Sequence, residues 1–272
     1  MSDLLIHSMA EFAPLIEPVL EMAEARDIAE IGSEFGGMSR ILAERCAAAG
    51  GTLTCIDPTP MDGFASWAAD QDRVRHIALP SLDAFDALGG QDAWVVDGDH
   101  NYHTVSNELA AIDAICAREG RPLLVFLHDV SWPCARRDMY YAPQRIPEDA
   151  RQPFDYDAGV VPGHAGALAG AGMRGMGQFA WALREGGPRN GVLTAIEDFL
   201  ARADSEARPL YWVQVPGVFG LGAIFDAKAP WAEEAARFLL PFHRNPLLER
   251  LEANRLANWL KVIEFQDRDR AA

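Results

Sequence analysis

The first half of the chain alternates short apolar runs with amphipathic segments. Five runs have the length of β-strands, are rich in Val, Ile and Leu, and are bounded by Gly, Pro or acidic residues. They cover residues 27–32, 52–57, 74–79, 92–98 and 121–130. Helical periodicity fills the intervals between them. Regular alternation of strands and helices is typical of βαβ units, so the pattern predicts a parallel sheet with helices on both faces.

The alternation stops at residue 131. Residues 131–190 are rich in Gly and Pro and show little periodicity, but they contain many aromatic and methionine side chains. Such a composition favours a folded lid over a flexible linker, because these side chains need something to pack against. A helix and two further strands follow. The strands are joined by a tight turn at Pro216-Gly217, which predicts an antiparallel pair.

Both ends of the chain have helical patterns. The N-terminal helix should be interrupted or bent near Pro18, and Ser81 should be the N-cap of a short helix. The last helices carry an apolar stripe, suited to packing or to a homo-oligomer contact: Leu247, Leu248, Leu251, Leu256 and Leu260. We therefore expect a helical addition over 1–26, an α/β domain over 27–230 with a lid at 131–190, and C-terminal helices over 231–272.

Composition narrows the possible partners and the compartment. The formal charge is −16, from 24 Lys and Arg against 40 Asp and Glu, which argues against nonspecific binding to nucleic acid or to anionic membranes. The 4 cysteines are scattered without zinc or dithiol spacing, as expected for reduced thiols in the cytoplasm. No secretory signal is visible, and no apolar run reaches the roughly 20 residues that cross a bilayer.

Acids and histidines follow two of the predicted strands. They are Asp97, Gly98, Asp99 and His100 after the fourth strand, and His128 and Asp129 after the fifth. The carboxyl ends of parallel strands form the edge at which open α/β sheets bind ligands. We expect these side chains to converge on one site. Two simpler interpretations stay open, since Asp97 and Asp99 would also suit the cap of the next helix, and His100 would also suit a partly buried structural position.

The turn after the first strand, "EIGSEFGGMS", is rich in glycine. Its Gly32 and Gly36 do not match the dinucleotide pattern G-x-G-x-x-G. Glu34 lies inside the turn, where it would repel a pyrophosphate at the start of the next helix. The turn therefore suits a cationic ligand without phosphate better than NAD. Asp57, at the end of the second strand, is placed to accept hydrogen bonds from a ribose diol.

Together, "AEIGSEFGGMS", "CIDP", "VVDGDHNYHTVSNEL" and "LLVFLHDV" resemble class I S-adenosylmethionine-dependent methyltransferases, over residues 27–130. The likeness is to the subgroup with a D-G-D-H-x-Y motif, many of which methylate oxygens of small molecules. It implies a doubly wound, mainly parallel seven-stranded sheet of the Rossmann-like methyltransferase fold. It also implies transfer from S-adenosyl-L-methionine to a hydroxyl of a small-molecule acceptor. An N-methyltransferase and a noncatalytic cofactor-binding protein of the same fold are the alternatives.

The resemblance also implies which residues bind the cofactor. The methionine and ribose part would contact Glu30, Gly32, Ser33 and Gly36, and Asp57 would bind the ribose hydroxyls. Ser81 and Leu82 would lie beside the adenine. The residues that close over the sulfonium and face the acceptor would be Asp97, Gly98, Asp99 and His100.

Two mechanisms for deprotonating the acceptor follow from the resemblance. In metal-dependent O-methyltransferases, acids at these strand ends bind Mg²⁺, which here would give Asp97, Asp129 and, less typically, His128. Histidine is a softer ligand than Mg²⁺ usually takes. Without a metal, a neutral histidine is the natural base. The candidate catalytic residues are then His100, His128 and Asp129.

Overall fold

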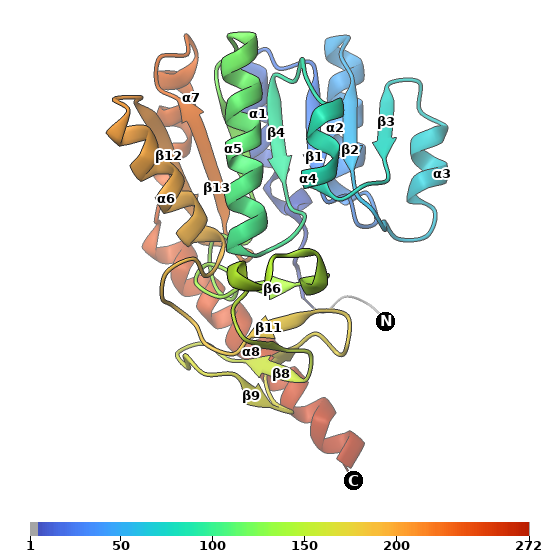
Figure 1. Ribbon diagram of the computed structural model, residues 1–272, viewed down its shortest axis with the longest axis vertical. Helices are drawn as coiled ribbons and strands as arrows, with labels where there is room; N and C mark the ends of the chain where they lie inside the picture. The colour runs from blue at the N-terminus through green and yellow to red at the C-terminus, as the bar shows by residue number, and fades with distance from the viewer. Residues whose placement is uncertain (1–4, 272) are drawn as a thin grey trace.

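The computed structural model of the protein describes residues 5–271, and its centre is a seven-stranded sheet. The strands are β1 (Ile28–Ile31), β2 (Leu53–Ile56), β3 (Val74–Ile77), β4 (Ala93–Val96), β5 (Leu124–Leu127), β12 (Leu210–Val215) and β13 (Leu221–Asp226). Their order is β12-β13-β5-β4-β1-β2-β3 (Figure 1). Strands β1 to β5 pair in parallel, whereas β13 is antiparallel to both β5 and β12. The predicted sheet and its antiparallel pair are confirmed.

Helices cover both faces of the sheet, because successive side chains of each central strand point to opposite sides and both sides are apolar. On one face, Ile28 and Val95 belong to the core cluster that includes helix side chains from α1 (Ala13–Met22), α2 (Gly37–Ala49), α3 (Phe64–Ala69) and α7 (Ala232–Leu239). On the other face, Ile31 and Trp94 belong to a second cluster with α4 (Ser81–Ala84), α5 (Tyr102–Glu119) and α6 (Val192–Ser205). This is the predicted doubly wound arrangement.

The predicted interruption at Pro18 and the predicted N-cap at Ser81 are wrong. Pro18 lies inside α1, which runs through it without a break, and a bend there stays a prediction. The missing N–H costs one hydrogen bond, but Ile16, Val19 and Leu20 are fully buried on this helix, and that packing outweighs the local loss. Ser81 is the first residue of α4, and Pro80 occupies the N-cap position.

Residues 131–190 fold below the carboxyl edge of the sheet (Figure 1). They form two small antiparallel sheets, ordered β10-β8-β9 and β6-β11-β7. Their strands are β6 (Met139–Tyr140), β7 (Phe154–Asp155), β8 (Ala158–Val160), β9 (Leu168–Ala169), β10 (Met173–Arg174) and β11 (Ala180–Ala182), with short helices η3 (Pro143–Arg145) and η4 (Glu148–Ala150) between β6 and β7. Buried Asp138 anchors the segment by accepting hydrogen bonds from Tyr102 N and Gly191 N, at the starts of α5 and α6. We call residues 131–190 the lid segment.

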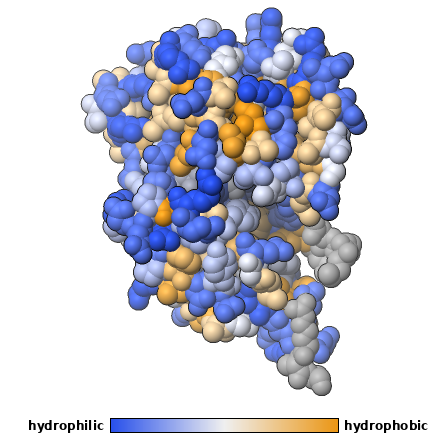
Figure 2. All heavy atoms as spheres, turned by 45° about the vertical axis from the view of Figure 1, so that its right-hand side comes forward, coloured by the Kyte–Doolittle hydropathy of each residue, from blue (hydrophilic) through white to orange (hydrophobic). Residues whose placement is uncertain are grey.

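A short helix, η1 (Met9–Phe12), opens the described chain, and η5 (Leu240–Phe242) leads into the long helix α8 (Pro246–Ala271). Helix α8 passes beside the lid segment (Figure 1). Its leucine stripe is divided, because Leu256 is buried but Leu247 and Leu251 are 63% and 56% exposed. The homo-oligomer contact through this stripe stays a prediction. The face drawn in Figure 2 is mostly hydrophilic, with small separate hydrophobic patches, and no helix in the described residues is long and apolar enough to cross a membrane.

Two buried carboxyl groups should make stability depend on pH. Burial raises the pKa of Glu108 from 4.5 to about 8 and that of Glu30 from 4.5 to about 7. At a pH between 4.5 and the raised pKa of each group, the folded state holds a proton that the unfolded chain has released. The free energy of unfolding should therefore fall as pH rises, by about 1.4 kcal/mol per pH unit for each group. In urea unfolding between about pH 5 and pH 8, Glu108→Gln should show a shallower decline than the wild type. Equal slopes would contradict this assignment.

Candidate active site

The carboxyl ends of the parallel strands open into one cavity of about 970 Å³. Residues 5–9, the lid segment and helix α8 supply its other walls. Every residue predicted to bind the cofactor or to act in catalysis lines the cavity, apart from Gly36. The expected convergence of the fourth and fifth strand ends is therefore confirmed.

The glycine-rich turn owes its shape to two glycines with positive φ. At Gly32 (φ +84°), an added Cβ would lie 2.1 Å from the carbonyl oxygen of Asp97, so the ends of β1 and β4 touch there. Gly36 (φ +84°) is the N-cap of α2, and its Cβ would lie 2.9 Å from the ring of Phe64. Gly36 thus packs against Phe64 and does not line the cavity, so its predicted contact with the cofactor stays a prediction.

Asp57 holds the same turn from the end of β2. Its Oδ2 accepts hydrogen bonds from the backbone N–H groups of Ser33 at 2.9 Å and Glu34 at 3.0 Å, and its Oδ1 accepts one from Thr59 N at 2.9 Å. The carboxylate also lines the cavity. Since a carboxylate has about four acceptor positions, Asp57 can hold the turn and still accept a ligand hydroxyl. Its contact with a ribose stays a prediction.

Glu30 is a buried acid at the base of the turn. It accepts hydrogen bonds from the hydroxyls of Ser33 and Ser39. Burial raises its pKa to about 7, although these hydrogen bonds oppose the shift. Near neutral pH a substantial fraction of Glu30 is therefore uncharged. It contributes less negative charge to the cavity than its sequence position suggested.

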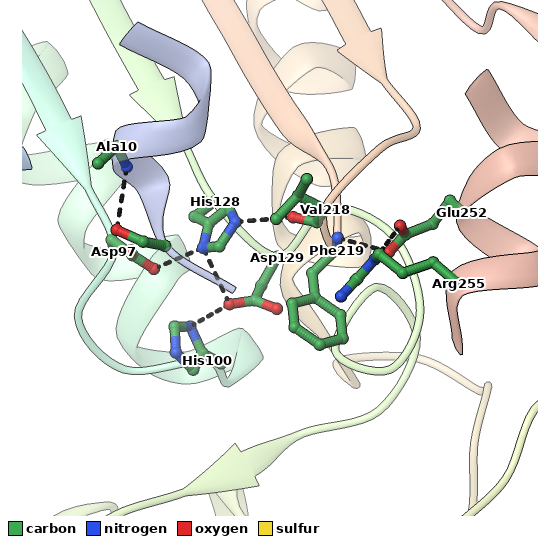
Figure 3. Close-up of polar contacts among 10 residues, drawn as sticks. Ala10, Asp97, His100, His128, Asp129, Val218, Phe219, Glu252 and Arg255 are labelled. Atoms are coloured by element: carbon green, nitrogen blue, oxygen red, sulfur yellow. Dashed lines mark hydrogen bonds and ion pairs between the residues drawn. The ribbon is translucent and has the colours of Figure 1, made fainter. Parts of the chain in front are cut away.

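His128 lies at the centre of the polar cluster (Figure 3). Its Nδ1 lies 3.0 Å from Asp97 Oδ1 and 3.4 Å from Asp129 Oδ2, and its Nε2 donates to the carbonyl oxygen of Val218 at 2.9 Å. Burial alone lowers the pKa of His128, but the charges of Asp97 and Asp129 outweigh it and raise the pKa to about 9. An acceptor thus lies at each ring nitrogen, and this arrangement with the raised pKa favours the imidazolium form of His128 near neutral pH.

This geometry argues against the two predicted roles of His128, as a base and as a metal ligand. A doubly protonated ring has no lone pair with which to accept a proton or to ligate a metal. The histidine that remains is His100, whose Nδ1 lies 3.5 Å from Asp129 Oδ2. Ligand atoms of Asp97, His100 and Asp129 all lie within 4.8 Å of one another, so His100 replaces His128 in the candidate metal set.

The revised set fits Mg²⁺ poorly. That ion prefers a nearly complete shell of oxygen ligands, whereas one of the three ligands here is an imidazole. The two carboxylates already face the positive charge of His128, which would oppose a second cation between them. The site does not support the predicted Mg²⁺.

The start of α5 uses a cap that the sequence prediction missed. Asn101 is the N-cap, and its side-chain oxygen accepts a hydrogen bond from Thr104 N at 2.9 Å. Asp99 Oδ2 accepts from the hydroxyl of Thr104 at 3.1 Å, and burial raises the pKa of Asp99. Asp99 therefore supports the first turn of the helix through Thr104. Asp97 faces His128 and does not cap α5.

The lid segment adds an aromatic wall to the cavity. The prediction from residues at the ends of the strands did not identify it. The rings of His100 and Tyr141 lie 5.9 Å apart between centroids, those of Tyr141 and Phe179 6.1 Å, and those of Phe179 and Trp181 5.2 Å. All four residues line the cavity. The sequence showed aromatics in this segment but gave no periodicity from which to choose those that reach the site.

Residues 29–130 match a family model described as a methyltransferase domain. By this match, residues 29–130 form a methyltransferase domain. The match runs from the second residue of β1 to just past the end of β5 and includes Asp97, His128 and Asp129. It confirms the predicted methyltransferase class. No curated relative matches the chain.

Three solved structures illustrate the likeness of this methyltransferase to other chains. The S-adenosylhomocysteine-bound methyltransferase PaMTH1 of Podospora anserina is 15% identical, with 80% of this chain and 79% of that chain covered and a TM-score of 0.47. An O-methyltransferase of Bacillus cereus is 14% identical, with 83% and 85% covered and a TM-score of 0.47. The O-methyltransferase TomG of Streptomyces achromogenes is 16% identical, with 83% of both chains covered and a TM-score of 0.46. TM-scores below 0.5 establish no shared function.

The protonation of His128 can be measured directly. At about pH 7 both ring nitrogens should give the chemical shifts of an imidazolium in nitrogen NMR, and the ring should release its proton with a pKa of about 9. Asp97→Asn should lower that pKa, because it removes the nearer carboxylate charge. A neutral His128 ring in the wild type at neutral pH would contradict the assignment.

Proposed function

We propose that the protein transfers a methyl group from S-adenosyl-L-methionine to a hydroxyl of a small-molecule acceptor bound between the sheet edge and the lid segment. One observation carries this proposal. His100 lines the cavity with Nδ1 against Asp129, while the neighbouring His128 is fixed as a cation. One histidine is thus arranged to accept a proton and the other is not. A hydroxyl needs such a base more than a neutral amine does, which favours O-methylation over N-methylation.

The cavity suits the cofactor in shape and in charge. The glycine turn lets the backbone approach a ligand closely, and Asp57 offers acceptors at the end of β2 for a ribose diol. Seven acidic residues line the cavity, and Arg145 is the one lysine or arginine among its described lining residues. His128 offsets part of the charge of Asp97 and Asp129, and burial protonates part of Glu30, but acidic groups still outnumber basic ones in this lining. The remaining negative charge favours a sulfonium and an ammonium group over phosphates. Ser81 and Leu82 line the wall beyond β3, where the adenine would lie.

When bound, S-adenosyl-L-methionine supplies an electrophilic methyl group on a positively charged sulfur. The protein's part is to hold the acceptor oxygen in line with that methyl group, and such positioning accounts for much of the rate in bimolecular transfers. Asp129 orients His100 through Nδ1, which leaves Nε2 to take the hydroxyl proton as the O–C bond forms and the C–S bond breaks. The lid segment keeps water from the site. Because the residues fit Mg²⁺ poorly, no step passes through a metal.

Cofactor binding tests the first half of the proposal. Titration calorimetry should detect binding of S-adenosylhomocysteine and no binding of NAD. Asp57→Ala should weaken that binding by roughly 1–3 kcal/mol, since it removes a charged hydrogen-bond acceptor and frees the turn. Asp62→Ala is the matched control, because Asp62 is an exposed acid on the following loop. Tight binding of NAD, or equal affinity in both variants, would refute the cofactor site.

Acceptor turnover tests the second half. A screen of small hydroxylated compounds first identifies an acceptor that the wild type methylates. With that acceptor, the kcat of His100→Ala should be at least about a hundredfold lower than that of the wild type, as expected for loss of a general base. His103→Ala is the control, since His103 also lines the cavity but lies on the first turn of α5. Excess chelator should leave the rate unchanged. Loss of activity in chelator, with recovery on adding a divalent ion, would instead favour the metal mechanism.

A further inference from the structure

Helix α8 carries an ion pair that hydrogen-bonds to two segments of the cavity wall without lining the cavity itself. Glu252 is 7% exposed, and its Oε1 accepts a hydrogen bond from Phe219 N at 2.8 Å. Both of its carboxylate oxygens accept from the guanidinium of Arg255 at 2.6 Å (Figure 3). Arg255 in turn donates to the carbonyl oxygen of Ile6 at 2.6 Å. Neither Glu252 nor Arg255 lines the cavity itself.

The first wall is the turn between β12 and β13. Val218 (φ +48°) and Phe219 (φ +63°) are consecutive non-glycine residues in the left-handed region, a conformation that persists only where the surroundings impose it. Glu252 holds the N–H of Phe219, and His128 holds the carbonyl of Val218. The α8 carboxylate and the active-site imidazolium therefore fix the same two-residue turn from its two sides.

The second wall is the segment before η1. Leu5, His7, Ser8 and Met9 line the cavity, and Leu5 packs against Phe219 and Leu256. The bond from Arg255 to the Ile6 carbonyl fixes the backbone in the middle of this segment. The guanidinium also lies 4.7 Å from the ring centre of Phe219. One ion pair thus ties the N-terminal wall, the strained turn and α8 together.

We infer that Glu252 and Arg255 are positioning residues of the active site, acting through Phe219 and Ile6 to hold the two walls that retain the bound S-adenosyl compound. This inference rests on the proposed cofactor site. The pair lies outside residues 29–130, the range that the methyltransferase family model covers, so α8 supplies a part of the site that this domain does not.

The test measures the dissociation rate of S-adenosylhomocysteine from the full-length protein by stopped-flow displacement. Arg255→Ala and Glu252→Ala should each raise that rate at least about fivefold, the effect of losing a charge-assisted hydrogen bond. Arg250→Ala and Glu249→Ala are the matched controls, because both residues are exposed on the same helix. The assay temperature is set below the onset of thermal unfolding of every variant.

Conservative variants separate positioning from general stability. Glu252→Gln keeps an acceptor for Phe219 N, and Arg255→Lys keeps a donor for the Ile6 carbonyl. S-adenosylhomocysteine should therefore dissociate more slowly from these two variants than from the alanine variants. Hydrogen exchange at the Phe219 amide should be fast in Glu252→Ala and slow in Glu252→Gln.

Three results would overturn the inference. They are dissociation rates in the alanine variants that equal those of the controls, no difference between Glu252→Gln and Glu252→Ala, and a protected Phe219 amide in Glu252→Ala. A wild-type protein that binds no S-adenosylhomocysteine overturns the proposed function, and this inference with it. If the wild type binds S-adenosylhomocysteine and the alanine variants release it at the same rate as the wild type, only this inference is overturned.

Discussion

The bonds of the His128 imidazolium join three separate parts of the molecule. Nδ1 faces Asp97 at the end of β4 and Asp129 after β5, and Nε2 donates to Val218 in the β12–β13 turn. A buried cation is tolerated only when it is paired and fully hydrogen-bonded. Each partner is therefore needed to keep the others in place, and removing one would leave an unpaired charge in a buried site.

This constraint changes how the acids of the cavity should be understood. Asp97 and Asp129 neutralise His128, Asp57 holds the glycine turn, and Asp99 supports the start of α5. Glu30 is partly protonated because it is buried. A cavity with many acids is thus less negative, and more rigid, than a count of carboxylates suggests. Rigid placement of such groups is what pre-organises a site for methyl transfer.

The additions to the central sheet complete that site. The lid segment contributes the wall of Tyr141, Phe179 and Trp181, and α8 fixes the turn that carries Val218. Both lie far along the chain from the glycine turn, yet both reach the same sheet edge (Figure 1). A parallel sheet alone would leave its ligand edge open to water, so these elements supply the enclosure that keeps water from a methyl-transfer site.

The sequence by itself determined the sheet, because the five apolar strands and the tight turn at Pro216-Gly217 follow from local hydrophobic patterns. It also placed Asp57, Asp97, His100 and Asp129 at one edge, since the carboxyl ends of parallel strands must meet there. These features depend on periodicity and on chain direction, which a single sequence carries.

Only the tertiary structure decided the roles of the individual side chains. Gly36 lies against Phe64, Asn101 caps α5 in place of the nearby aspartates, and His128 lies between two carboxylates that raise its pKa, whereas His100 contacts Asp129 alone of these acids. Each outcome depends on a partner distant in sequence, such as Val218, 90 positions after His128. Protonation and hydrogen bonding are set by what surrounds a group in space, and local patterning does not encode those surroundings.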